Sequence, residues 1–150
     1  MARSSALKLD DFLPYLVNRV GAALVERFTR DALSRHGLTI DMWRVLAALS
    51  NGGGKRQIDL AAMTSIEAST VSRLVTKLVG MNLVSRSRSR TSNREVIVQL
   101  TNKGQTLVGR LVPVAIELER TASSGASAAD MSATKRVLRQ AFENLLGTKG

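Results

Sequence analysis

The chain has 150 residues, a formal net charge of +10 and 44% hydrophobic residues, so it can bury a core and is not a disordered chain. A charge this positive favours a polyanionic partner, either nucleic acid or an anionic membrane surface. Since there is no cysteine and one histidine, His36, the sequence excludes disulfides and thiol chemistry and argues against a zinc site.

The first predicted helix covers residues 10–35. Its apolar side chains recur at spacings of three and four, which places them on one face: Phe12, Leu13, Leu16, Val20, Ala23, Leu24 and Phe28. Gly37 follows as a stop signal. A second helix is predicted to begin at Thr39 or Asp41, both favourable N-cap residues, and to end before the glycines at 52–54.

Two further helices are predicted over residues 57–63 and 65–80, joined by a tight turn. Thr64 and Glu67 have the spacing of a capping box, in which each side chain bonds the backbone amide of the other residue. Two helices joined in this way, the second with a polar outer face, form the helix-turn-helix arrangement.

The hydrophobic period then changes from that of a helix to that of a strand. Residues 83–88 and 95–100 alternate, and the segment between them is polar, which predicts a β-hairpin with a basic tip. A long helix is expected over residues 102–123, with a kink at Pro113, and a last helix over residues 129–146.

The first and last predicted helices are apolar on one side, yet they lie outside the helix-turn-helix and the hairpin. Their apolar faces must be shielded from water, and packing against a second copy of the chain related by a two-fold axis is the simplest way to bury them. The alternative is that these helices pack on their own lobe. We therefore expect a homodimer.

The polar side of the helix predicted over residues 65–80 carries hydroxyls and cations and no acidic residue. Arginine can bond a guanine edge through two hydrogen bonds, serine and threonine can bond a base or a phosphate, and lysine neutralises a phosphate. The alternative is an ordinary solvated face of a packed helix. The candidate DNA contacts from this segment are Ser65, Ser69, Thr70, Ser72, Arg73, Thr76 and Lys77.

The predicted hairpin is the most one-sidedly charged part of the chain. No acidic residue occurs between Glu67 and Glu95. Arg90 and Arg94 lie near the tip, where they could enter a narrow minor groove, which attracts arginine. The alternative is an edge strand that is protected by charge. The candidate DNA contacts from the hairpin are Arg86, Arg88, Arg90, Asn93 and Arg94.

Four segments form a wider pattern. Residues 36–46 read HGLTIDMWRVL, with a GLT opening followed by W-x-V-L, and residues 70–75 read TVSRLV in the second helix of the helix-turn-helix. Residues 83–86 (LVSR) and 96–101 (VIVQLT) are the two strands. In this order and at these spacings, the segments resemble the MarR (multiple antibiotic resistance regulator) family of transcription regulators.

The resemblance implies a mainly α fold (α+β), a winged helix-turn-helix with N- and C-terminal dimerisation helices. The whole chain, 1–150, would form one MarR-type domain, with dimerisation helices at 10–36 and 102–146 and a DNA-binding lobe at 39–101. The resemblance also implies a homodimer that represses transcription from a palindromic operator in double-stranded DNA. A small aromatic acid, or its coenzyme A thioester, would release the DNA.

Two residues depart from the family's pattern. The wing of the family commonly carries Asp-x-Arg, and Ser92 stands here in place of the aspartate that orients Arg94. Arg94 would then be held differently, by Glu95 for example, or be more mobile. Met42 stands where the family often has glutamine after Thr39, so we expect half of a capping box to be lost at a cost of about 1 kcal/mol or less.

An effector pocket is the least defined expectation. Two positions on the first helix and three around the second could line a pocket for an aromatic anion. Trp43 is also a natural core residue, and His36 is also a natural helix-end residue. The candidates are Tyr15, Arg19, His36, Trp43 and Arg44.

Other functions fit the sequence less well. An enzyme is disfavoured, because the chain has no cysteine, one histidine, no glycine-rich phosphate loop and no acidic cluster. A non-specific architectural DNA-binding protein, or a constitutive regulator without an effector, remains open. Because no segment has the apolar length of a signal peptide or a membrane span, we expect a cytoplasmic protein with no metal, no cofactor and no membrane partner.

Overall fold

The computed structural model describes residues 6–91 and 94–147. The longer helices are α1 (Leu13–Phe28), α2 (Ile40–Leu49), α3 (Gln57–Thr64), α4 (Ala68–Gly80), α5 (Asn102–Ala122) and α6 (Ala128–Gly147). Short helical turns precede and follow α1, namely η1 (Leu9–Asp11), η2 (Thr29–Leu33) and η3 (Ser34–His36). The strands are β1 (Lys55–Arg56), β2 (Val84–Arg88) and β3 (Val96–Leu100). The mainly α fold with a small antiparallel hairpin confirms the predicted fold class.

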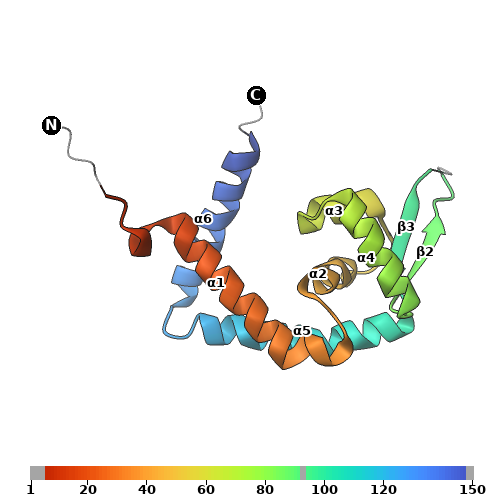
Figure 1. The fold of residues 1–150 in the computed structure, drawn as a ribbon, viewed down its shortest axis with the longest axis horizontal. Coiled ribbons are helices and arrows are strands. Elements are labelled where there is room, and N and C mark those ends of the chain that lie inside the picture. Colours follow the sequence, from red (N-terminus) through yellow and green to blue (C-terminus); the bar gives the residue numbers. More distant parts are fainter. Residues whose placement is uncertain (1–5, 92–93, 148–150) are drawn as a thin grey trace. The chain divides into compact units, whose positions relative to one another are not determined.

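The chain divides into two compact units, one ending at Ala115 and the other beginning at Ile116. In the first unit, α2, α3 and α4 pack together, and α4 also contacts β2, as Figure 1 shows. The core of this unit consists of aliphatic side chains that the helical and strand periods place on one side of each element. Its fully buried members include Leu33, Val45, Leu46, Leu60, Val71, Val75, Leu78 and Val98.

The sheet has the strand order β1-β3-β2 and is antiparallel throughout. The predicted hairpin is confirmed, with Val84 opposite Leu100 and Arg88 opposite Val96. The sequence did not predict β1, because two residues are too few to show an alternating pattern. In the sheet, Lys55 pairs with Val98 and joins the base of α3 to the hairpin.

The turn between α3 and α4 differs from the prediction. Ser65 has the left-handed backbone conformation, with φ of 57°, and it ends α3, so α4 begins at Ala68 rather than at Ser65. The hydroxyl of Thr64 donates to the carbonyl of Leu60, within its own helix, at 2.6 Å. Glu67 is the N-cap of α4 and makes no side-chain capping bond. The predicted capping box between Thr64 and Glu67 is therefore wrong.

The N-terminus of α2 has both hydrogen bonds of a capping box. Thr39 is the N-cap, as predicted, and its hydroxyl accepts a hydrogen bond from the amide of Met42 at 3.3 Å. The Sδ atom of Met42 accepts from the amide of Thr39 at 3.5 Å. The expected loss of half of this capping box is wrong, because a thioether is a weak acceptor that can replace the missing amide oxygen.

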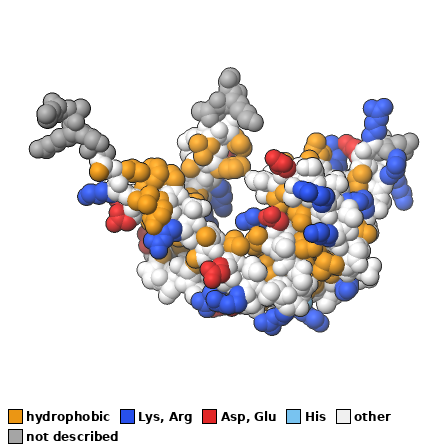
Figure 2. All heavy atoms as spheres, in the orientation of Figure 1, with side chains coloured by type: hydrophobic (Ala, Val, Ile, Leu, Met, Phe, Trp, Pro, Cys, Tyr) orange, Lys and Arg blue, Asp and Glu red, His pale blue; other side chains and the backbone are white. Residues whose placement is uncertain are grey.

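The terminal helices keep apolar faces that their own units do not cover. In α1, Leu16 is 40% exposed and Val20 is 55% exposed, and in α6 Phe142 is 51% exposed and Leu145 is 76% exposed. Figure 2 shows hydrophobic side chains on the surface of both helices. No residue of α6 is buried. Each of these faces is available to a further partner.

The first turn of α6 gives a stability prediction. The hydroxyl of Ser127 accepts from the amide of Asp130, and the carboxylate of Asp130 accepts from the amide of Ser127, both at 3.0 Å. The hydrogen bond from the amide of Ser127 to the carboxylate lowers the pKa of Asp130. We expect Ser127→Ala to lower the free energy of unfolding by about 1 kcal/mol, measured by urea denaturation. The control is Ser124→Ala, and an equal loss there would contradict the capping role of Ser127.

Candidate nucleic-acid interface

The outer face of α4 is polar and accessible. Ser69, Arg73, Thr76 and Lys77 are exposed, whereas Thr70 and Ser72 are half-buried. The opposite side of the helix buries Val71, Val75 and Leu78 against the core. Packing therefore fixes which face of α4 is presented, and the hydroxyls and cations lie on that face. Ser65 lies outside the helix, exposed in the turn that precedes it.

Arg73 is the central cation of this face. Its guanidinium donates to the hydroxyl of Thr70 at 3.3 Å. Among the described residues, neither Arg73 nor Lys77 has a carboxylate partner. Both charges are therefore available to an external anion.

Arg86 connects the hairpin to α4. Its guanidinium donates to the carbonyl of Ser72 at 3.0 Å and to the hydroxyl of Thr76 at 3.1 Å. Arg86 lies on β2 in the same alternation as the buried Val84, which turns its side chain toward the helix. These bonds hold the hairpin against the middle of α4. The sequence predicted that Arg86 contacts DNA, whereas the structure gives its guanidinium two partners within the protein.

The hairpin tip, or wing, carries the remaining arginines. Arg88, Arg90 and Arg94 are exposed, and Figure 2 shows Lys and Arg side chains gathered there. The amide of Ser89 donates to the carbonyl of Glu95 at 2.9 Å and closes the ladder below the tip. Asn93, together with Ser92, lies outside the described residues.

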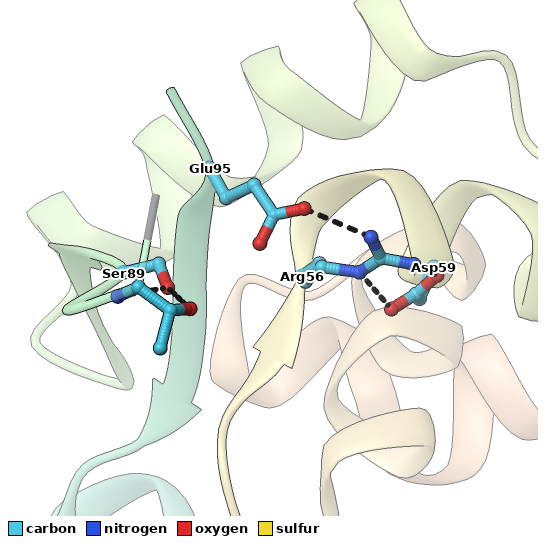
Figure 3. A network of polar contacts seen from close by, with 5 residues as sticks. Arg56, Asp59, Ser89 and Glu95 are labelled. Carbon is cyan, nitrogen blue, oxygen red and sulfur yellow. Dashed lines mark hydrogen bonds and ion pairs between the residues drawn. The ribbon is translucent and has the colours of Figure 1, made fainter. Parts of the chain in front are cut away.

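A network of ion pairs lies at the base of the wing (Figure 3). The guanidinium of Arg56 contacts Asp59 at 2.8 Å and Glu95 at 2.9 Å. The guanidinium lowers the pKa of Asp59 through its hydrogen bonds to that carboxylate. The ion-pair partner of Glu95 among the described residues is thus Arg56 and not Arg94. The spacing of Arg56 and Asp59 was a signal for part of this network, but nothing in the sequence placed Glu95 beside them.

The five candidate effector residues have different surroundings in the described structure. Arg19 lies over the ring of Tyr15, 5.5 Å from its centroid, and Arg44 pairs with Asp41 at 2.8 Å. Trp43 packs edge-to-face on Phe28, with centroids 5.3 Å apart, as a half-buried core residue. Of the five, His36 lines a cavity of about 510 Å³ in the first unit.

The fold and this surface define a class of protein. A three-stranded sheet, a helix-turn-helix and a cationic hairpin beside the second helix form a winged helix-turn-helix, the architecture of DNA-binding regulators. The MarR family model matches residues 38–96. The HTH-type transcriptional repressor Mb2911 of Mycobacterium bovis is 30% identical over 131 residues, which cover 87% of this chain and 94% of that protein. The chain belongs to the MarR family of transcription regulators.

Solved structures agree with this assignment. A MarR family transcriptional regulator from Silicibacter pomeroyi superimposes with a TM-score of 0.83 at 27% identity, over 95% of each chain. BpsR of Bordetella bronchiseptica superimposes with a TM-score of 0.75 at 26% identity, over 85% of this chain and 96% of that one. The DNA binding of BpsR is regulated by 6-hydroxynicotinic acid.

The curated relatives are transcriptional regulators rather than enzymes. Within residues 6–91 and 94–147, no helix has the length and apolar character needed to cross a membrane. The same residues contain no group of three or more His, Asp or Glu side chains that could hold a metal ion.

Proposed function

We propose that this protein is a homodimeric repressor that binds an imperfect palindromic operator in double-stranded DNA. The observation that carries the proposal is the exposed surface of α4 and the wing, which has hydroxyls and cations and whose sequence has no acidic residue between Glu67 and Glu95. In this arrangement α4 enters the major groove, and the wing follows the backbone into the minor groove.

The residues divide into those that read bases and those that position the protein. Arg73 is the residue best placed to bond a guanine edge, and the hydroxyls of Ser69 and Thr70 are beside it on α4. Lys77, Arg88, Arg90 and Arg94 neutralise phosphates or enter the minor groove. We assign Arg86 to holding the wing on α4, because its guanidinium is bonded to Ser72 and Thr76.

The apolar faces of the terminal helices support the dimer. Helix α1 exposes Leu13, Leu16, Val17 and Val20, and α6 exposes Val137, Leu138 and Phe142. In a two-fold dimer the same surface of each copy covers its counterpart, so two such faces become buried in one step. The proposed division assigns residues 10–36 and 102–146 to dimerisation and residues 39–101 to DNA binding.

The test compares the affinity of the dimer for random DNA with its affinity for the upstream region of its own gene. A specific regulator requires a ratio of at least about 10³ at physiological salt. If each dimer places about eight cations on phosphates, the slope of log K against log salt is about −7. Equal affinity for both DNAs would instead identify a non-specific architectural protein.

We further propose that a small aromatic acid releases the protein from DNA. The similarity to BpsR, whose DNA binding responds to 6-hydroxynicotinic acid, supports this proposal. The check is a thermal-shift screen with aromatic acids and their coenzyme A thioesters, followed by DNA-binding titrations with each compound that binds. A panel with no shift would favour a constitutive regulator.

The wing offers a separate prediction about salt. We expect Arg94→Ala to weaken binding to all DNA sequences alike, because a phosphate or minor-groove cation is lost from each protomer. The slope of log K against log salt should become shallower by about 2 for the dimer. Fluorescence anisotropy across a salt series measures both effects. A change confined to the operator would show that Arg94 reads bases.

A further inference from the structure

Arg56 stands at a position where a helix usually has a capping side chain. It is the N-cap residue of α3, but its side chain makes no capping hydrogen bond. Serine, threonine, aspartate and asparagine are preferred at this position, because their short side chains accept from free amides of the first turn. The guanidinium of Arg56 instead contacts two carboxylates, those of Asp59 and Glu95. The start of α3 therefore has a bridge to the wing in place of a side-chain cap.

The contact with Asp59 fixes the guanidinium. Nε and Nη2 of Arg56 donate to the two carboxylate oxygens of Asp59 at 2.8 Å and 2.9 Å, within the first turn of α3. A two-bond contact of this kind sets the plane of the guanidinium as well as its position. The third nitrogen, Nη1, donates to Oε1 of Glu95 at 2.9 Å, 39 residues later in the chain. Arg56 thus presents a fixed donor to Glu95 (Figure 3).

Glu95 is held through its backbone as well as its side chain. Its carbonyl accepts a hydrogen bond from the amide of Ser89 at 2.9 Å, which ties it to the other side of the hairpin. In the sheet Arg56 pairs with Ile97, two residues beyond Glu95, so Arg56 and Glu95 are diagonal neighbours. Arg94 is the next residue toward the tip. The contacts of Glu95 therefore fix the base from which the exposed Arg94 extends.

The wing is attached to the helix-turn-helix on both of its sides. Arg86 on β2 bonds to α4, and Glu95, just before β3, bonds to Arg56 at the start of α3. An exposed ion pair adds little to the stability of a fold, but it can set the direction of a surface ribbon. The sequence has Ser92 rather than an aspartate near Arg94, so this second attachment takes the orienting role.

We propose that Arg56 is a positioning residue for DNA binding, which acts through Glu95 to direct Arg94 toward the minor groove. Arg56 itself is held on α3 and makes no contact with DNA in this arrangement. The inference rests on the proposed contact of Arg94 with DNA, because it names the residue that holds that contact in place.

The first experiment measures the wing in the full chain without DNA. Because the chain has no cysteine, Thr91→Cys, exposed in the wing, carries a single nitroxide label whose motion is measured by electron paramagnetic resonance. Arg56→Met, Glu95→Gln and the double variant should shorten the rotational correlation time of this label by the same amount, since each breaks the same pair. A label at Ser124→Cys, exposed between α5 and α6, should show no change.

The second experiment measures affinity for the upstream DNA by fluorescence anisotropy. The double variant Arg56→Met/Glu95→Gln removes the pair without changing the net charge, so it isolates position from electrostatics. It should bind about threefold to tenfold more weakly than the parent. When Arg94→Ala is already present, the same double change should cost less than about twofold, because the residue that it positions is absent.

The matched control is Arg120→Met/Glu117→Gln. It removes another exposed ion pair, at 2.7 Å on α5, again with no change in net charge. This variant should bind the upstream DNA like the parent. Thermal unfolding shows that each variant is folded.

Three results would overturn the inference: a wing label that moves no faster without the pair, a double variant that binds DNA like the parent, or an equal loss of affinity with and without Arg94→Ala. The last result would show that Arg56 contacts DNA directly. The proposed function fails by a different result, namely a parent that binds its upstream DNA no better than random DNA. The label measurement is made without DNA, so the two failures are distinguishable.

Discussion

Arg73→Ala is expected to reduce the affinity of the dimer for its operator by about 30-fold or more. Arg73 is exposed at the centre of the outer face of α4, and its partner among the described residues is the hydroxyl of Thr70. A two-bond contact from arginine to guanine contributes about 1–3 kcal/mol, and a two-fold dimer loses it in both half-sites. Titration of labelled operator and random DNA measures the effect.

Comparing operator DNA with random DNA separates the loss of base recognition from the loss of a phosphate-binding charge. Random DNA should lose only the effect of one cation per protomer, so the specificity ratio should fall with Arg73→Ala. Arg73→Lys keeps the charge but cannot make the two-bond contact, so it should bind random DNA normally and the operator weakly. If Arg73→Ala bound both DNAs like the parent, the assignment of α4 as the reading helix would fail.

The second large effect is expected at Gly104, in the first turn of α5. A Cβ atom there would lie 2.0 Å from the carbonyl oxygen of Leu83, which is backbone and cannot rotate away. The carbonyl of Leu83 also accepts a hydrogen bond from the amide of Thr101 at 3.1 Å, so the start of α5 is joined to the start of β2. We expect Gly104→Ala to lower the free energy of unfolding by about 3 kcal/mol, at the upper end of overpacking effects.

Gly109 provides the matched control on the same helix. A Cβ atom at Gly109 meets nothing within 4 Å. Because alanine is the better helix former, Gly109→Ala should raise the free energy of unfolding by about 0.5–1 kcal/mol. Urea denaturation of both variants gives the comparison. A Gly104→Ala protein as stable as Gly109→Ala would show that the α5 start is not held against Leu83.

Much of the fold could be predicted because its elements have strong hydrophobic periods. The apolar spacing of Val71, Val75 and Leu78 predicted both the presence of α4 and the face that it buries, and the structure agrees. The change to a period of two predicted the hairpin over β2 and β3. These signals are local, so a single sequence contains them.

The features that could not be predicted arise where tertiary context decides the structure. Ser65 adopts a left-handed conformation that sequence spacing does not reveal, and this conformation removed the predicted capping box. Arg86 and Arg88 look equivalent in an alternating strand, but the packing of α4 on β2 brings Ser72 and Thr76 to Arg86. The meeting of Lys103 with Met81 likewise depends on two segments that are 22 residues apart.

The bond between Arg86 and Thr76 restricts how this protein can acquire a new target sequence. Thr76 belongs to the helix that we propose reads the major groove, and its hydroxyl also accepts a hydrogen bond from Arg86, the residue that holds the hairpin. A substitution at Thr76 therefore alters major-groove chemistry and minor-groove approach together. A change of operator is easier through Ser69 or Arg73, whose side chains make no hydrogen bond to the hairpin in the described structure. Recognition at this helix is thus divided into positions that are free to diverge and one that is tied to the geometry of the wing.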